Sequence, residues 1–250
     1  MNVLLFYFSG TGNTRWAAER LCGMLAERGH RAQAVAVETA DMAAAARTAA
    51  AFDRIGFACP LYGADIPRIM RRSIRQFLDA ATAVPGIPRK LFFISTFAYV
   101  NGSGVFEARR LLRHTPFQVE SYVNIKMINS APEKGARKSS ADADAERRRS
   151  ATRKLAEFVG RLESGRPCIN GAGPQLLIGM LIRALLRNTI ANNYRRMRVD
   201  LQACTRCLQC VRNCPVQCIQ FAGEHFTFSE SCEACMRCYH GCPVHAISNG

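Results

Sequence analysis

The sequence predicts an α/β protein with a doubly wound parallel sheet, followed by a small cysteine-rich α+β domain. Three observations in the 250 residues predict it. Strand-like and helix-like patterns alternate over roughly residues 1–160, a glycine-rich loop follows the first apolar run, and residues 199–250 hold two cysteine motifs of equal spacing. The chain is long enough for both parts.

The alternation contains five β/α units. Short apolar runs predict strands near residues 3–8, 31–38, 54–59, 90–97 and 117–128. Amphipathic patterns predict helices near residues 14–28, 41–51, 67–80, 104–114 and 142–163. A charged stretch rich in small residues, 133–150, predicts an exposed loop that leads into the last of these helices.

The loop between the first strand and the first helix predicts a phosphate site. Glycines let the backbone turn closely around an anion, hydroxyls donate to it, and the helix N-terminus adds free N–H groups and a positive dipole end. The sequence contains neither the Walker pattern nor the dinucleotide fingerprint. The candidate binding residues in this loop are Ser9, Gly10, Thr11, Gly12, Asn13 and Thr14.

This loop resembles the FMN-phosphate loop of flavodoxins, and the resemblance extends over roughly residues 1–160. It implies a flavodoxin-like five-stranded sheet of order 2-1-3-4-5, with FMN at the carboxyl ends of the strands. The alternative is a doubly wound domain with an empty pocket.

The same resemblance implies that the loops after the third and fourth strands flank the isoalloxazine ring. Tyr62 and Tyr99 can stack on the flavin, although a loop aromatic can equally serve only in packing. The candidate contacts in these loops are Pro60, Leu61, Tyr62, Gly63, Thr96, Phe97, Tyr99, Asn101 and Gly102. Three other thiols, Cys22, Cys59 and Cys168, are interpreted as buried or incidental.

Two cysteine motifs near the C-terminus predict two [4Fe–4S] clusters. They are Cys204-x-x-Cys207-x-x-Cys210-x-x-x-Cys214-Pro and Cys232-x-x-Cys235-x-x-Cys238-x-x-x-Cys242-Pro. Disulfides are disfavoured because Met1 leads directly into an apolar strand without a secretory signal, and this start predicts a cytoplasmic protein. Zinc is disfavoured because zinc ribbons use simple C-x-x-C pairs.

These motifs resemble those of bacterial two-cluster ferredoxins, in which the fourth cysteine of each run ligates the other cluster. The resemblance implies one cluster on Cys204, Cys207, Cys210 and Cys242, and the other on Cys232, Cys235, Cys238 and Cys214. Residues 204–219 align without gaps on 232–247, which indicates a duplication. Cys218 aligns with Ala246, so it is interpreted as a packed residue and not as a ligand.

The predicted domains are residues 1–164 and 199–250, with a linker over 165–198. Within the linker, residues 176–190 are apolar but interrupted by Arg183 and Arg187, which leaves a run too short to span a bilayer. This segment is predicted to be a helix buried between the domains. Its basic, amphipathic character also permits docking on a membrane surface.

The net charge of +15 is unevenly distributed. Residues 1–130 hold 16 basic against 9 acidic side chains, residues 131–200 hold 15 against 7, and residues 201–250 hold 3 of each. With FMN and two clusters bound, the protein would still carry a charge of roughly +9. This charge predicts an acidic redox protein, of ferredoxin or flavodoxin type, as partner, and permits an anionic membrane surface. Nucleic acid is not predicted, because no binding motif accompanies the charge.

The whole chain thus resembles flavodoxin–ferredoxin fusion proteins. The resemblance implies an electron carrier that couples FMN to two clusters and exchanges electrons with a redox partner. The alternative is a ferredoxin-fed, FMN-dependent reductase of a small molecule, for which Tyr62 and Asp65 are the candidate proton donors. No catalytic residue is assigned, and the carrier is favoured over the enzyme.

Overall fold

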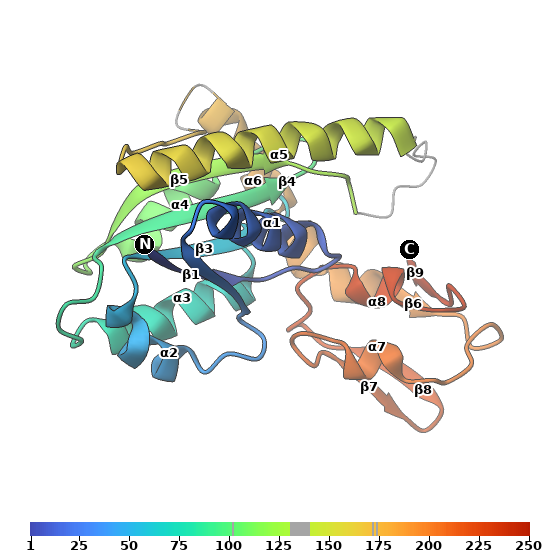
Figure 1. Ribbon diagram of the computed structural model, residues 1–250. Helices are drawn as coiled ribbons and strands as arrows, with labels where there is room; N and C mark the ends of the chain where they lie inside the picture. Colours follow the sequence, from blue (N-terminus) through green and yellow to red (C-terminus); the bar gives the residue numbers. More distant parts are fainter. Residues whose placement is uncertain (102, 131–140, 172, 174) are drawn as a thin grey trace.

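The computed structural model describes residues 1–101, 103–130, 141–171, 173 and 175–250 (Figure 1). Its central element is a parallel sheet of five strands in the order β2-β1-β3-β4-β5. This order confirms the predicted flavodoxin-like fold class. The strands are β1 Asn2–Tyr7, β2 Arg31–Ala36, β3 Arg54–Pro60, β4 Lys90–Phe97 and β5 Gln118–Lys126.

Helices cover both faces of the sheet, as the doubly wound fold requires (Figure 1). One face packs against α1 (Asn13–Glu27) and α5 (Ala141–Ser164). The other packs against α2 (Met42–Thr48), α3 (Arg68–Ala81) and α4 (Gly104–Leu112), and a short 3₁₀ turn, η1 (Ala49–Ala51), follows α2. The predicted helices lie within a few residues of those observed.

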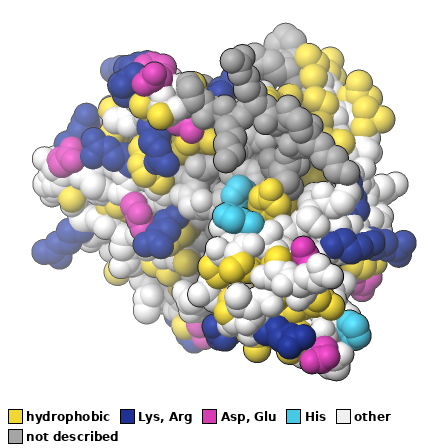
Figure 2. Space-filling view, turned by 90° about the vertical axis from the view of Figure 1, so that its right-hand side faces the viewer, with side chains coloured by type: hydrophobic (Ala, Val, Ile, Leu, Met, Phe, Trp, Pro, Cys, Tyr) yellow, Lys and Arg dark blue, Asp and Glu magenta, His cyan; other side chains and the backbone are white. Residues whose placement is uncertain are grey.

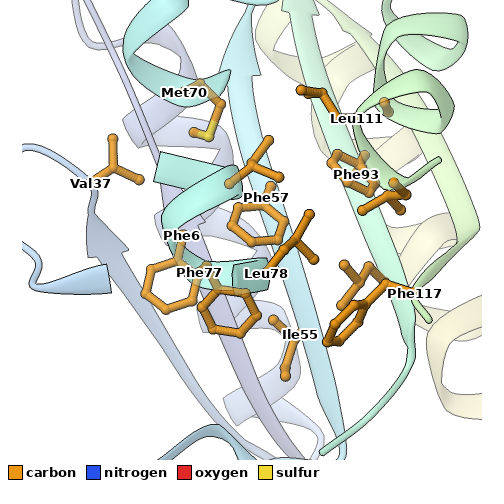
Figure 3. Close-up of a cluster of buried hydrophobic side chains, with 14 of the residues drawn as sticks. Phe6, Val37, Ile55, Phe57, Met70, Phe77, Leu78, Phe93, Leu111 and Phe117 are labelled. Carbon is orange, nitrogen blue, oxygen red and sulfur yellow. The ribbon is translucent and has the colours of Figure 1, made fainter. Parts of the chain in front are cut away.

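Side chains of the strands alternate between two hydrophobic cores. In β1, Leu4 and Phe6 face the α2–α4 side, and Val3 and Leu5 face the α1–α5 side. The first core holds a group of aromatic rings (Figure 3). The ring of Phe6 lies 5.6 Å from that of Phe57 and 5.4 Å from that of Phe77, measured between centroids. Such rings add specific packing to the burial of a continuous apolar run.

The cysteine-rich segment, residues 199–250, folds with short elements beside the carboxyl edge of the large sheet (Figure 1). β6 (Met197–Val199) pairs antiparallel with β9 (Ile247–Asn249), and β7 (Ile219–Ala222) forms a hairpin with β8 (His225–Phe228). Two single-turn helices, α7 (Gln209–Arg212) and α8 (Arg237–His240), follow the cysteine loops. The predicted domain boundaries remain predictions, and β6 crosses the one at 199.

The segment between α5 and β6 forms α6 (Gln175–Ala191) and a 3₁₀ turn, η2 (Asn193–Arg196). Ile182 and Ile190 on α6 are partly buried, whereas Leu177, Leu181 and Leu185 are 73%, 61% and 69% exposed. The expectation of a buried helix is therefore wrong for one face of α6, because no described residue covers its outer side. None of the helices in the described part of the chain is long and apolar enough to span a bilayer.

Candidate functional site

The loop from Ser9 to Thr14 joins the carboxyl end of β1 to the N-terminus of α1. Gly12 begins the helix with a φ of 98°, a left-handed conformation that glycine adopts without a steric penalty. The first helical bond runs from Trp16 N–H to Gly12 O (2.9 Å), so the N–H groups of Asn13, Thr14 and Arg15 precede the helical ladder. Together with the positive end of the helix dipole, these groups fit an anion.

Side chains of this loop hold it against the ends of β4 and β5. Thr14 Oγ1 lies 2.7 Å from Thr96 Oγ1, and Asn13 Nδ2 donates to Ile128 O at 2.9 Å. Thr11 Oγ1 donates to Ser130 Oγ at 2.6 Å. These bonds within the chain fix the shape of the loop, which lowers the entropic cost of binding a ligand.

A cavity of about 500 Å³ opens at this edge of the sheet, within the usual size range of small-molecule sites. It is called the edge cavity below. Twelve of the fifteen predicted cofactor-binding residues line it: Ser9, Gly10, Thr11, Asn13, Thr14, Pro60, Leu61, Tyr62, Gly63, Thr96, Phe97 and Tyr99.

Two of the remaining three do not line it. Gly12 and Asn101 are not part of the lining, and Gly102 lies outside the described residues. Asp65, a candidate proton donor, lines a different cavity and pairs with Arg183 (Nε–Oδ2 2.7 Å) and Arg71. That pairing occupies both carboxylate oxygens of Asp65. Of the two candidate proton donors, Tyr62 alone borders the edge cavity.

Sequence reasoning missed several parts of the wall. Met127–Ser130 follow β5 and were detectable, because all parallel strands end at the same edge. Ala98 and Val100 lie in the predicted loop after the fourth strand, and the rest of the missed residues come from remote segments without a local signal. These remote residues are Ile182, Leu186, Thr189, Ile190, Asn193, Arg196, Ala234, Cys235, Met236 and Asn249.

Two asparagines in the lining of the edge cavity hold unpaired polar atoms. Among the described residues, Asn193 Nδ2 and Asn249 Oδ1 are buried, have no hydrogen-bond partner and belong to residues of the lining. A buried donor and a buried acceptor left unpaired cost free energy. Both atoms are closed off from the cavity, so their side chains would have to turn before a ligand could pair with them.

The two tyrosines differ in their surroundings. Tyr99 is 67% exposed at the rim, and its hydroxyl accepts from Asn129 Nδ2 at 3.3 Å. Tyr62 lies deeper, and burial raises its pKa well above the ordinary value. Tyr62 therefore remains a neutral phenol that can donate a hydrogen bond, and Tyr99 presents an open aromatic surface for stacking.

The cysteines of the C-terminal motifs line two small cavities. Cys204, Cys207, Cys210 and Cys242 surround one of them, which we call the first thiol set. Cys214, Cys232, Cys235 and Cys238 surround the other, the second thiol set, and Cys218 joins them there. These sets match the crossed assignment implied by the ferredoxin resemblance. In the described part of the chain, no three His, Cys, Asp or Glu side chains are gathered for a single metal ion.

The backbone repeats in both thiol loops. Arg206 and Leu208 adopt left-handed conformations (φ 54° and 57°), and so do their repeat equivalents Ala234 and Met236 (53° and 58°). Such non-glycine conformations cost about 1 kcal/mol each and persist where the surrounding structure fixes them. The duplication seen in the sequence is thus present in the fold.

Backbone N–H groups also aim at the sulfurs in equivalent positions. Cys218 N–H donates to Cys214 Sγ and Ala246 N–H to Cys242 Sγ, both at 3.3 Å. Donors of this kind stabilise thiolates, the form that binds iron. Cys218 Sγ lies 3.4 Å from Cys214 Sγ, whereas Ala246 fills the equivalent position without a thiol.

Cys235 connects the two halves of the site. It belongs to the second thiol set and also lines the edge cavity. A Cβ added at Gly10 would lie 2.5 Å from Cys235 O and 3.0 Å from Cys235 Cβ, and closer still to the Tyr62 hydroxyl. The glycine in the phosphate-type loop is therefore needed because the thiol loop packs directly on it.

Arg237 fastens this contact. Its guanidinium donates to Ser9 O (2.6 Å) and Gly10 O (3.2 Å), and forms two 2.6 Å bonds to the Glu38 carboxylate. In a trans peptide the C=O and N–H point in opposite directions. The N–H groups of Gly10 and Thr11 therefore point away from Arg237.

Glu233 makes a second attachment. Its carboxylate is 7% exposed and accepts from Arg68 N–H (2.9 Å) and Ile69 N–H (2.8 Å), the first residues of α3. Helix α3 has no side-chain cap of its own, so Glu233 caps it from the cysteine-rich segment. Burial raises the pKa of Glu233. The N–H groups of Arg68 and Ile69 oppose this effect, because they stabilise the ionised carboxylate.

Comparisons with known proteins give similarities of fold. No protein-family model matches the chain, and neither does a curated protein sequence. The Flv1 flavodiiron core from Synechocystis sp. PCC6803 is 18% identical, with a TM-score of 0.43; the match covers 65% of this chain and 36% of that one. Megasphaera elsdenii flavodoxin is 15% identical, with a TM-score of 0.45 and coverage of 64% and 98%. Flavodoxin 1 from Bacillus cereus is 15% identical, with a TM-score of 0.41 and coverage of 64% and 98%.

The packing of Cys235 on Gly10 can be tested by adding one methyl group. We expect Gly10→Ala to destabilise the protein by about 1–3 kcal/mol, because the thiol loop must move. Gly23→Ala is the matched control: it lies within α1 with no atom near its added Cβ, and should stabilise by about 0.5–1 kcal/mol. Urea unfolding measures both. Equal stability of the two variants would show that the thiol loop does not rest on Gly10.

Proposed function

We propose that this chain is an electron-transfer protein that holds FMN in the edge cavity and two [4Fe–4S] clusters on its two thiol sets. One observation carries the proposal: Cys235, a member of the second thiol set, lines the same cavity as the phosphate-type loop. Electron transfer weakens steeply with distance, so shared walls between two cofactor sites indicate a common redox function.

Each part of the edge cavity has a role toward FMN. The N–H groups at the start of α1 would bind the phosphate, and Tyr99 would stack on the ring. Asn193 and Asn249, which line the cavity, would lie beside the bound flavin. When bound, the flavin supplies one- or two-electron chemistry and each cluster one-electron chemistry.

The two thiol sets differ in their access to solvent. Cys207 in the first set is exposed, whereas its repeat equivalent Cys235 in the second set is partly buried and packs on Gly10. The first set therefore offers a contact point for an external redox protein. The second set serves the edge cavity.

We propose an acidic redox protein of ferredoxin or flavodoxin type as the partner. The support is the net charge of +15, which would attract such a partner and raise its association rate.

A reductase of a small molecule is the second candidate. It is favoured by one observation: the Tyr62 phenol, which can donate a proton, borders the edge cavity. Turnover of a small electron acceptor that is lost in Tyr62→Phe, with flavin content unchanged, would favour this candidate over the carrier.

Cofactor content is the direct test of the proposal. Protein purified without oxygen is expected to carry about eight Fe and one FMN per chain, since eight thiols and one phosphate-type loop are present. Iron, acid-labile sulfide and released flavin are measured on the same sample. Bound zinc without sulfide would exclude the clusters.

The crossed thiol sets predict which cysteines matter. Cys214→Ala should remove a ligand of the second set and lower the iron content toward about four per chain. Cys218→Ala should leave the iron content and the visible spectrum unchanged, because its repeat equivalent is Ala246. Iron loss in Cys218→Ala would contradict the interpretation of Cys218 as a packing residue.

The phosphate-type loop can be tested separately from the ring site. Thr11→Asp places a carboxylate at the N-terminus of α1 and should weaken FMN binding at least roughly tenfold through like-charge repulsion. Riboflavin, which lacks the phosphate, is the control ligand, and its affinity should hardly change. Flavin fluorescence titration of the apoprotein measures both. Equal losses for FMN and riboflavin would place the phosphate elsewhere.

A further inference from the structure

The outer face of α6 is apolar and unusually exposed. It presents large side chains that are more than half exposed, namely Leu177, Ile178, Leu181 and Leu185, and we call this face the α6 ridge. Hydrophobic side chains gather at the upper right of the molecule in Figure 2. Contiguous apolar surface of this kind marks an interaction site.

The orientation of the ridge is fixed by the opposite face of α6. Arg183 Nε lies 2.7 Å from Asp65 Oδ2, and Arg183 Nη1 lies 2.9 Å from Oε1 of the fully buried Glu107. Near the end of the helix, a Cβ added at Gly63 would lie 2.9 Å from Ile190 Cγ1, which shows close packing. The inner face is therefore attached, and the ridge must point outward.

The chain segment that contains the ridge is basic. Residues 164–199 contain six arginines and no acidic residue. Arg195 and Arg198 follow α6 directly and are exposed. A helix with an apolar outer face and a basic flank matches the surface that binds anionic lipid, where the apolar side chains enter the acyl boundary and the arginines contact headgroups.

We infer that the α6 ridge docks this protein on an anionic membrane surface. A second copy of the chain fits the ridge less well. A two-fold interface would bring the acid-free segments of both copies together, and their arginines would repel each other. An anionic bilayer supplies the opposite charge and covers the apolar face at the same time.

Vesicle cosedimentation of the full-length holoprotein tests the inference. Binding is expected to vesicles of phosphatidylglycerol and phosphatidylcholine, to weaken as salt rises, and to be lost on phosphatidylcholine alone. The double variant Leu181→Glu with Leu185→Glu should bind at least roughly tenfold more weakly. Neither residue lines the edge cavity, so the flavin and iron content should be retained.

A matched control makes the same chemical change elsewhere. Phe106 and Leu201 are also exposed, at 41% and 40%, and lie outside α6. Phe106→Glu with Leu201→Glu should leave vesicle binding unchanged. Unaltered binding of the ridge variant would overturn the inference. Analytical ultracentrifugation gives a second check. The inference would also be overturned if the wild type were a dimer and the ridge variant a monomer, while both bound vesicles equally.

Discussion

The guanidinium of Arg237 is the contact on which the arrangement of the site depends. Arg237 lies between Cys235 and Cys238, and it reaches the carbonyls of Ser9 and Gly10. Arginine suits this position because its planar fork donates to several acceptors at once. Its hydrogen bonds to Glu38 raise its pKa further, so the charge is permanent. One residue thus joins the phosphate-type loop to a thiol loop.

Other contacts turn this joint into a rigid attachment. Glu233 caps α3. In the opposite direction, the Arg68 side chain of α3 donates to Cys232 O in the second thiol loop at 2.6 Å. His240 Nε2 lies 2.7 Å from Ser130 O, beyond the end of β5. Three separate loops of the α/β sheet therefore hold one small segment. Multiple attachments of this kind restrict relative motion and keep the two candidate cofactor sites adjacent.

The duplication gives the two thiol loops the same backbone conformation, but their cysteines lie in different surroundings. Burial raises the pKa of Cys235 to about 12, whereas the backbone N–H of Gln209 lowers the pKa of exposed Cys207. These two cysteines occupy equivalent positions in the repeat. Solvent exposure is one of the properties that set cluster potentials, so identical motifs need not give identical clusters. The asymmetry at these two positions comes from the α/β sheet, because its loop packs on Cys235 whereas Cys207 is exposed.

The sequence by itself determined the local features. Strand and helix periodicity predicted the five β/α units, and the loop Ser9–Thr14 could be located because its chemistry is contiguous in the chain. The cysteine spacing predicted the three neighbouring thiols of each set for the same reason, whereas the crossed fourth cysteine was implied only by the resemblance to two-cluster ferredoxins. The tertiary structure alone decided that Cys235 borders the edge cavity, that Asn193 and Asn249 complete it, and that one face of α6 stays uncovered. Those properties depend on contacts between residues far apart in the chain, and hydrophobic periodicity within a segment carries no information about which surfaces such contacts bury.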